Sequence, residues 1–219
     1  MCTRMNVQQG KFIVLEGVDG SGISTQTNLL KNWFAENQYL GKAYFTKEPT
    51  EGPVGGIIRL ALAKRLKPMD EKVMALLFAA DRIDHLCCTE EHEQKEGIVS
   101  LLEKGYTVIS DRYYLSSFAY QSVQLDLAWL RQINSFALQP DLTILLKVPV
   151  EESAQRRQKS RIHEELYEKD EYLQKISRNY GIIAGKLQAE GHNILVVNGN
   201  RTQYEIFENI KAAVLKLFL

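Results

Sequence analysis

A short apolar run that leads straight into a glycine-rich loop and then into an amphipathic segment constrains this chain more than any other feature. The run is Phe12–Glu16, the loop begins at Gly17, and the amphipathic segment follows Ser24. Glycines allow tight backbone turns that direct consecutive N–H groups inward, and the N-terminus of a following helix adds partial positive charge. The order of these pieces predicts a strand, an anion-binding loop and a helix.

The loop departs from the usual phosphate-binding pattern at one position. The residues expected to face phosphate are Gly17, Asp19, Gly20, Ser21, Gly22, Ile23, Ser24 and Thr25. Ser24 occupies the position whose hydroxyl ligates Mg²⁺, but the pattern requires a lysine just before it and Ile23 stands there. The glycines are therefore also compatible with a plain strand-to-helix turn, or with a protein that binds phosphate without transferring it.

Five short runs rich in β-branched or aromatic residues predict strands. They are Phe12–Leu15, Ala43–Phe45, Thr107–Ile109, Thr143–Leu146 and Ile194–Val197. Segments with helical spacing separate them, and Thr202 with Glu205 has the spacing of a capping box before the last of these segments. Such alternation implies crossover connections, so we expect a three-layer α/β domain with a parallel sheet and helices on both faces.

The composition of the chain argues against some classes of binding partner and against export from the cell. Residues 1–219 contain 27 basic and 27 acidic side chains, so no overall positive charge favours nucleic acid. The apolar runs are far shorter than the ~20 residues needed to cross a bilayer, and the first ten residues lack an apolar signal core. We expect one cytoplasmic domain over 1–219, with no membrane or nucleic-acid partner. Cys2, Cys87 and Cys88 form no disulfide or zinc-site pattern.

A second polar cluster follows the third predicted strand. Asp111 and Arg112 come directly after Thr107–Ile109, and the carboxyl ends of parallel strands converge on one crevice. Asp111 could hold a metal ion, directly or through water, and the planar fork of Arg112 could bind an acceptor phosphate. An Asp-Arg pair by itself is also typical of a surface ion pair.

The segment 156–170 is dense in both charge signs and poor in large apolar residues. This pattern is typical of a solvated helix face followed by a turn. Alongside a phosphate loop it also fits a mobile lid that closes over phosphate. Arg157 and Arg161 are four residues apart and would share a face of a helix.

Four ordered blocks make the chain resemble the thymidylate kinase family from Lys11 to about Phe218. They are Glu16–Gly22, then Lys47–Pro49 with Ile58–Arg59, then Leu77–Arg82, then Asp111–Tyr113 with Ser117, Ala119, Tyr120 and Gln121. The resemblance implies a P-loop kinase fold with a five-stranded sheet, a homodimer, and transfer of a phosphoryl group from Mg·ATP to dTMP, giving dTDP and ADP. A dedicated general base is not expected, because the acceptor phosphate is already an oxyanion.

The resemblance also implies roles for individual residues. It assigns dTMP binding to Asp19, Lys47, Arg59, Phe78, Arg82, Arg112, Ser117, Tyr120 and Gln121. Phe78 would stack on thymine and Arg82 would donate to its exocyclic oxygen, although Phe78 also fits a simple buried helix. Asp19 would contact the sugar or the reacting phosphates. In the bacterial arrangement the lid supplies the catalytic arginine, so Arg157 and Arg161 join Asp19 and Arg112 as catalytic candidates, with Arg156 in reserve.

Three departures from the family pattern keep other functions open. Ile23 replaces the loop lysine, Lys47 replaces the arginine usual before Glu-Pro, and Lys147 stands where many relatives have an acidic residue. A kinase for another nucleotide or for a deoxynucleoside would retain the same loop. A nucleotide-binding regulator without transfer activity would explain Ile23.

Overall fold

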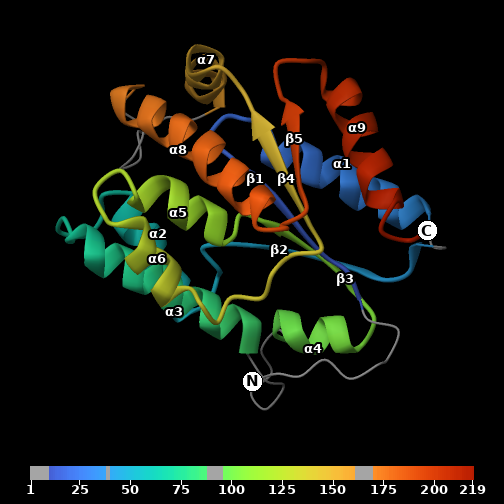
Figure 1. Ribbon diagram of the computed structural model, residues 1–219, viewed down its shortest axis with the longest axis horizontal. Coiled ribbons are helices and arrows are strands. Elements are labelled where there is room, and N and C mark those ends of the chain that lie inside the picture. The colour runs from blue at the N-terminus through green and yellow to red at the C-terminus, as the bar shows by residue number, and fades with distance from the viewer. Residues whose placement is uncertain (1–9, 38–39, 88–95, 161–169) are drawn as a thin grey trace.

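In the computed structural model, which describes residues 10–37, 40–87, 96–160 and 170–219, five parallel strands form one sheet (Figure 1). The strands are β1 (Phe12–Gly17), β2 (Ala43–Lys47), β3 (Thr107–Asp111), β4 (Leu142–Lys147) and β5 (Ile194–Asn198), in the order β2-β3-β1-β4-β5. All five predicted strands are confirmed, each one or two residues longer than its apolar run. The ladders continue into polar residues, so that Lys47 pairs with Asp111 at the carboxyl ends of β2 and β3.

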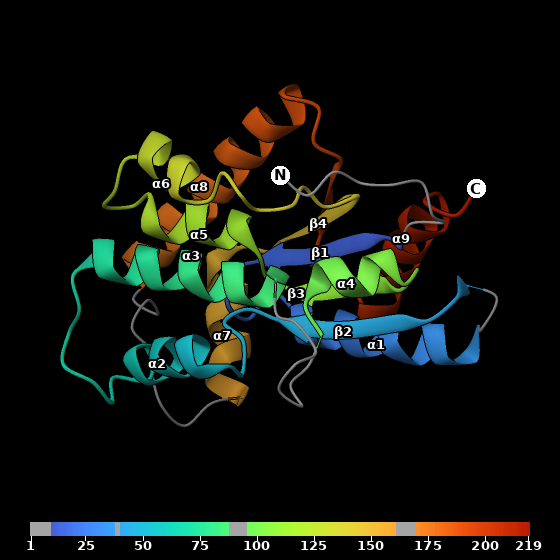
Figure 2. The ribbon, with the colours of Figure 1, turned by 90° about the horizontal axis from the view of Figure 1, so that it is seen from below.

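Helices cover both faces of this sheet, as predicted. They are α1 (Ile23–Glu36), α2 (Pro53–Leu62), α3 (Glu71–Cys87), α4 (Ile98–Glu103), α5 (Tyr114–Gln121), α6 (Leu127–Ile133), α7 (Val150–Ser160), α8 (Asp170–Ala189) and α9 (Gln203–Leu215). α5 and α8 pack on one face of the sheet and α1 packs on the other. Figure 2 shows the strands β4, β1, β3 and β2 side by side, with α4 in front of them. The capping box of α9 is present, with Thr202 and Glu205 each bonded to the other's backbone N–H.

Alternation along β1 divides the core between the two faces. Phe12 and Val14 pack with α4, α5 and α8, whereas Ile13 and Leu15 pack with α1 and α9. All four side chains are almost completely buried, as expected for a central parallel strand covered on both sides. This packing fixes the end of β1, and therefore the loop that follows it, against both helix layers.

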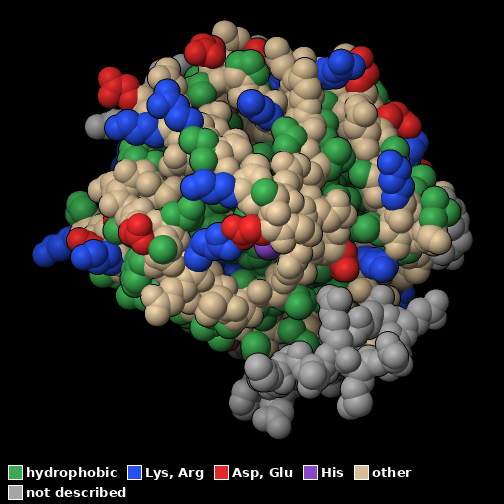
Figure 3. Space-filling model, in the orientation of Figure 1, with side chains coloured by type: hydrophobic (Ala, Val, Ile, Leu, Met, Phe, Trp, Pro, Cys, Tyr) green, Lys and Arg blue, Asp and Glu red, His purple; other side chains and the backbone are tan. Residues whose placement is uncertain are grey.

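Two observations describe the surface of the residues that the structure places. None of the helices in the described ranges is long and apolar enough to cross a bilayer. On the face seen in Figure 3, basic side chains are interspersed with acidic ones and with apolar patches. Cys87 is an exposed free thiol, while Cys2, Cys88 and Arg161 lie outside the described residues.

Candidate active site

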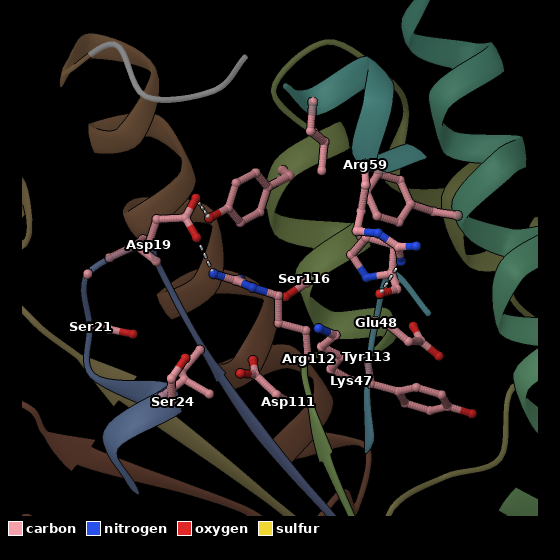
Figure 4. Close-up of a pocket in the computed structure, with 18 of the residues that line it drawn as sticks. Asp19, Ser21, Ser24, Lys47, Glu48, Arg59, Asp111, Arg112, Tyr113 and Ser116 are labelled. Atoms are coloured by element: carbon pink, nitrogen blue, oxygen red, sulfur yellow. Dashed lines mark hydrogen bonds and ion pairs between the residues drawn. The ribbon is translucent and has the colours of Figure 1, made fainter. Parts of the chain in front are cut away.

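A cavity of about 890 Å³ opens at the carboxyl ends of β1, β2 and β3. It is lined by the glycine-rich loop and by residues of α2, α3, α5 and α7 (Figure 4). Every described residue proposed above for phosphate, dTMP or metal lines it except Gly17, which ends β1 beneath the loop. Among its described lining residues, Lys47 and five arginines face three acidic side chains, so the cavity is positive although the chain is neutral.

The loop has the backbone shape of an anion cradle, and α7 packs directly on it. Gly20 and Gly22 have φ values of 83° and 98°, in the left-handed region that favours glycine. A Cβ on Gly20 would lie 2.4 Å from the Ser153 carbonyl oxygen and 3.1 Å from Cγ of Arg157. Gly20 is therefore required both for the turn and for the approach of α7.

Ile23 is buried in the core beneath the loop and brings no charge to the cavity. Its side chain is 5% exposed and belongs to the cluster that joins β1, β4, α1 and α9. Positive charge comes instead from α7. Arg157 is 8% exposed and donates to the Asp19 carbonyl oxygen at 3.0 Å, while Arg156 donates to Glu152 and to the Gly199 carbonyl oxygen.

Arg112 is tied to the loop rather than exposed as a surface ion pair. Its NH1 group donates to the Gly17 carbonyl oxygen at 2.8 Å, and its NH2 group contacts Asp19 Oδ1 at 2.6 Å. Figure 4 shows this guanidinium extended toward Asp19. The backbone of Arg112 has φ 71°, which is uncommon for a residue with a side chain and typical of functional sites. The Tyr120 hydroxyl donates to the other oxygen of Asp19 at 3.3 Å.

A fully buried carboxyl group, Glu16, lies directly behind Arg112. It accepts from the backbone N–H groups of Tyr113 and Ser116, at the start of α5, and from the hydroxyls of Ser116 and Tyr180. Burial raises the pKa of Glu16 from 4.5 to about 7, although the Ser116 hydrogen bond and the charge of Arg112 oppose the shift.

Ser24 and Asp111 form an oxygen pair at the base of the cavity. The Ser24 side chain bonds to the Asp111 carboxyl group, and both are seen together in Figure 4. Burial raises the pKa of Asp111, the charge of Arg112 opposes this, and the nearby Asp19 adds to it. A hydroxyl and a carboxylate are ligands that Mg²⁺ prefers, so this pair fits a magnesium ion. The described residues contain no cluster of three or more His, Cys, Asp or Glu ligands that could hold a metal alone.

Arg82 lies at the opposite end of the cavity and is held by an extended polar network. Its Nε and NH2 groups donate to Glu48 Oε2 at 3.0 and 2.7 Å, NH2 also donates to Ser117 Oγ, and NH1 donates to Asn134 Oδ1. Glu48 in turn bonds to His85, which bonds to Thr46.

Phe78 lies one helical turn from Arg82 on α3, is half-buried and lines the cavity. Its side chain is therefore not simply buried inside a core helix.

Sequence reasoning missed the residues that support these arginines. Glu16 and Glu48 occur in the blocks that carry the family resemblance, but neither was proposed for the site. A carboxylate at the end of an otherwise apolar strand was a usable signal for Glu16, because a buried acid requires partners. Asn134 and Tyr180 gave no local signal, since they meet Arg82 and Glu16 across 52 and 164 residues of sequence.

Comparisons with known proteins agree with this geometry. The thymidylate kinase family model matches residues 15–210. A "probable thymidylate kinase" of Pyrococcus abyssi is 42% identical over 212 residues, covering 94% of this chain and 96% of that protein. Proteins of the same description from Pyrococcus horikoshii (46% over 153 residues, 68% and 70% covered) and Methanococcus aeolicus (40% over 203 residues, 91% and 93%) are also similar. The chain belongs to the thymidylate kinase family.

Proposed function

We propose that this chain transfers the γ-phosphoryl group of ATP to the 5′-phosphate of dTMP, giving ADP and dTDP. The observation that carries the proposal is one continuous cavity with a phosphate loop at one end and the Phe78–Arg82 group at the other. Arg112 and Asp19 lie between them, where the acceptor phosphate must meet the donor. Since both reactants are polyanions, positioning and charge neutralisation provide most of the catalysis.

The Arg82 end of the cavity suits the edge of thymine. Arg82 has five N–H donors, and the described contacts occupy four of them, leaving one NH1 proton for a ligand. Gln121 Oε1 is buried and has no hydrogen-bond partner among the described residues. Thymine offers a carbonyl acceptor beside an N3–H donor, which complements this pair. Cytosine presents an amino group and a bare ring nitrogen there, and would leave both protein groups unsatisfied.

At the phosphate end, the chain's own arginines replace the missing loop lysine. We assign Arg112 to the dTMP phosphate, with Lys47 beside Asp111 and Arg59 on α2 as further cations that line the cavity. We assign Arg157 to the transferred phosphoryl group, because it already lies against the loop. Residues 156–170 form the proposed lid, in which Arg161 is a second candidate that lies outside the described residues. Ser24 and Asp111 would hold Mg²⁺, which supplies further neutralisation of the ATP phosphates.

Because the reaction consumes ATP and dTMP, we infer a cytoplasmic protein.

We further infer a homodimer that forms through α3. Val73, Leu76 and Ile83 are 46%, 50% and 46% exposed, and their spacing places them on one outer face of this helix. Phe78 and Arg82 line the cavity from the same helix. Figure 2 shows α3 along the outside of the molecule with α2 beside it, and α2 adds the exposed Ile57 and Leu60. A second copy that covers this apolar face would also brace the cavity wall.

A panel of acceptors tests the proposed function. Purified protein with Mg·ATP is given dTMP, dUMP, dCMP, dGMP, dAMP or thymidine in separate reactions, and ADP release is measured. We expect dTMP to exceed dCMP by roughly five- to a hundredfold in kcat/KM, because an unpaired buried donor opposite the wrong base costs about 1–3 kcal/mol. Equal use of dCMP would contradict the assignment of Arg82 and Gln121. Preference for thymidine would indicate a deoxynucleoside kinase, and dTMP binding without ADP release would indicate a regulator.

A further inference from the structure

The buried carboxyl group of Glu16 does not line the cavity, yet it contacts two of the hydroxyl groups that hold Arg112. Glu16 is completely buried and Tyr180 is 3% exposed. Arg112 NH1 donates to Ser116 Oγ at 3.1 Å and to the Tyr180 hydroxyl at 3.3 Å. Both hydroxyls also contact Glu16 Oε2, at 2.5 and 3.2 Å, and lie 2.7 Å from each other. Three elements, β1, α5 and α8, therefore meet at one hydrogen-bonded cluster behind the arginine.

The hydrogen-bond directions in this cluster depend on the charge of Glu16. Each hydroxyl has one proton and two lone pairs. When Glu16 is a carboxylate, the Ser116 proton points to it, and the Tyr180 proton points to it or to Ser116 Oγ. Both oxygens then present lone pairs to Arg112. The other carboxyl oxygen accepts two backbone N–H groups, so an added proton must reside on Oε2. That proton would occupy a hydroxyl lone pair, and it would remove the negative charge that attracts the guanidinium through this cluster.

We propose that Glu16 is a positioning residue for Arg112, acting through the hydroxyls of Ser116 and Tyr180, so that its negative charge holds the guanidinium in place for the acceptor phosphate. This inference rests on the proposed role of Arg112 in dTMP binding. The same carboxylate accepts the N–H groups at the start of α5, where a negative charge is favoured. The helix that carries Ser117, Tyr120 and Gln121 is thereby fixed to the same point as Arg112.

The Glu16 pKa of about 7 places its ionisation within the working range of most enzymes. The charged and titratable groups that face Glu16 are Arg112, Tyr180 on α8 and Tyr114 on α5. Burial raises the pKa of both tyrosines, so they remain neutral here and Arg112 remains charged. Glu16 is thus the group in this cluster that changes charge near neutral pH.

The test uses the full-length protein with Glu16→Gln and Tyr180→Phe, and Tyr172→Phe as a matched control. Tyr172 lies on α8 as well, but its hydroxyl contacts Gln124 instead of Glu16. We expect both cluster variants to weaken dTMP binding, measured by calorimetry, and to lower kcat/KM for dTMP by about five- to thirtyfold, with KM for ATP changed less than twofold. The control should match wild type within twofold.

In wild type, kcat/KM for dTMP should rise as pH increases through 7, beyond the rise caused by ionisation of the dTMP phosphate. Glu16→Gln should remove that additional rise.

A double-mutant cycle separates positioning from general stability. In an Arg112→Ala background, Glu16→Gln should change dTMP affinity less than twofold, because the residue through which it acts is gone. Full additivity, or equal effects of Tyr180→Phe and Tyr172→Phe, would overturn the inference while the kinase assignment stands. If wild type neither binds dTMP nor transfers to it, the proposed function fails and the inference fails with it. If dTMP binds without transfer, the calorimetric cycle decides the inference alone.

Discussion

Ile23 places a buried aliphatic side chain at the position where this type of loop usually has a lysine. Two unit charges about 4 Å apart interact by about 4 kcal/mol at an effective dielectric constant of 20, so an uncompensated loss could slow transfer about a thousandfold. Arg157 lies against the same loop, with its guanidinium on the Asp19 carbonyl oxygen. The compensation therefore depends on α7, which the loop contacts through Gly20.

The first prediction is that Arg157→Ala lowers kcat about 100- to 1,000-fold and that Ile23→Lys partly restores it. Rescue should be incomplete, because a lysine lacks the arginine fork and because a buried aliphatic position must accept a charged side chain. The lysine variant should lose about 1–3 kcal/mol of unfolding free energy. Single-turnover kinetics at saturating Mg·ATP and dTMP measure the chemical step. Arg156→Ala is the matched control, and a fall as large as that of Arg157→Ala would refute the assignment.

The second prediction concerns stability against pH and follows from Glu16. Burial raises its pKa from the ordinary value of 4.5 to about 7 in the folded protein, so the folded state binds more protons than the unfolded state between these two pH values. The contribution of Glu16 to stability is therefore fully present below pH 4.5 and is lost as pH rises through 7. The total is of order a few kcal/mol. Denaturant unfolding of wild type and Glu16→Gln at several pH values should show the difference between the two changing across this window. A difference independent of pH would disprove the shift.

Among the elements, the strands could be predicted and the helix contacts could not. The apolar runs identified all five strands. The reason is clearest for the central strands β1 and β4, which are buried on both faces and therefore carry the apolar runs Phe12–Leu15 and Ile144–Leu146. Capping at Thr202 followed from local spacing alone. By contrast, the docking of α7 on the loop joins Gly20 to Ser153, and no periodicity within either segment encodes it.

The residues of the candidate site likewise include some that the sequence could predict and some that only the folded chain brings together. The cavity gathers the described residues that the family resemblance named, because strand ends and the loop converge on it. The buried partners Glu16, Glu48 and Asn134 remained hidden, since they act through contacts that only the folded chain creates. The orientation of Ile23 into the core also could not be derived, because an isoleucine after a loop glycine fits either side of the turn.

The third prediction tests the contact between α7 and the loop. Gly20→Ala should abolish measurable transfer, because the added Cβ would lie 2.4 Å from a backbone oxygen of α7. Gly41→Ala is the matched control: Gly41 has a similar φ of 84°, but nothing lies within 4 Å of an added Cβ. Both variants should lose about 1 kcal/mol or more of stability from backbone strain, measured by denaturant unfolding. Activity in Gly20→Ala equal to that of Gly41→Ala would show that α7 need not touch the loop.

For the whole molecule, the fourth prediction is that the apolar face of α3 joins two copies. Leu76→Asp should shift the protein from dimer to monomer in analytical ultracentrifugation, because a carboxylate would be buried without a partner. Ile182→Asp on α8 is the control, since Ile182 is equally exposed at 51%. A dimer that survives Leu76→Asp, or a wild type that is monomeric at every concentration, would refute the interface.

The most direct test of the central claim is to follow the label from ATP carrying a radioactive γ-phosphate, with wild-type protein, Mg²⁺ and dTMP in a single turnover. We predict that the label appears in dTDP at its β-phosphate, in an amount equal to the ADP formed. Label that remains in ATP while dTMP is bound, or that appears as free phosphate, would contradict the claim that this cavity is the active site of a thymidylate kinase.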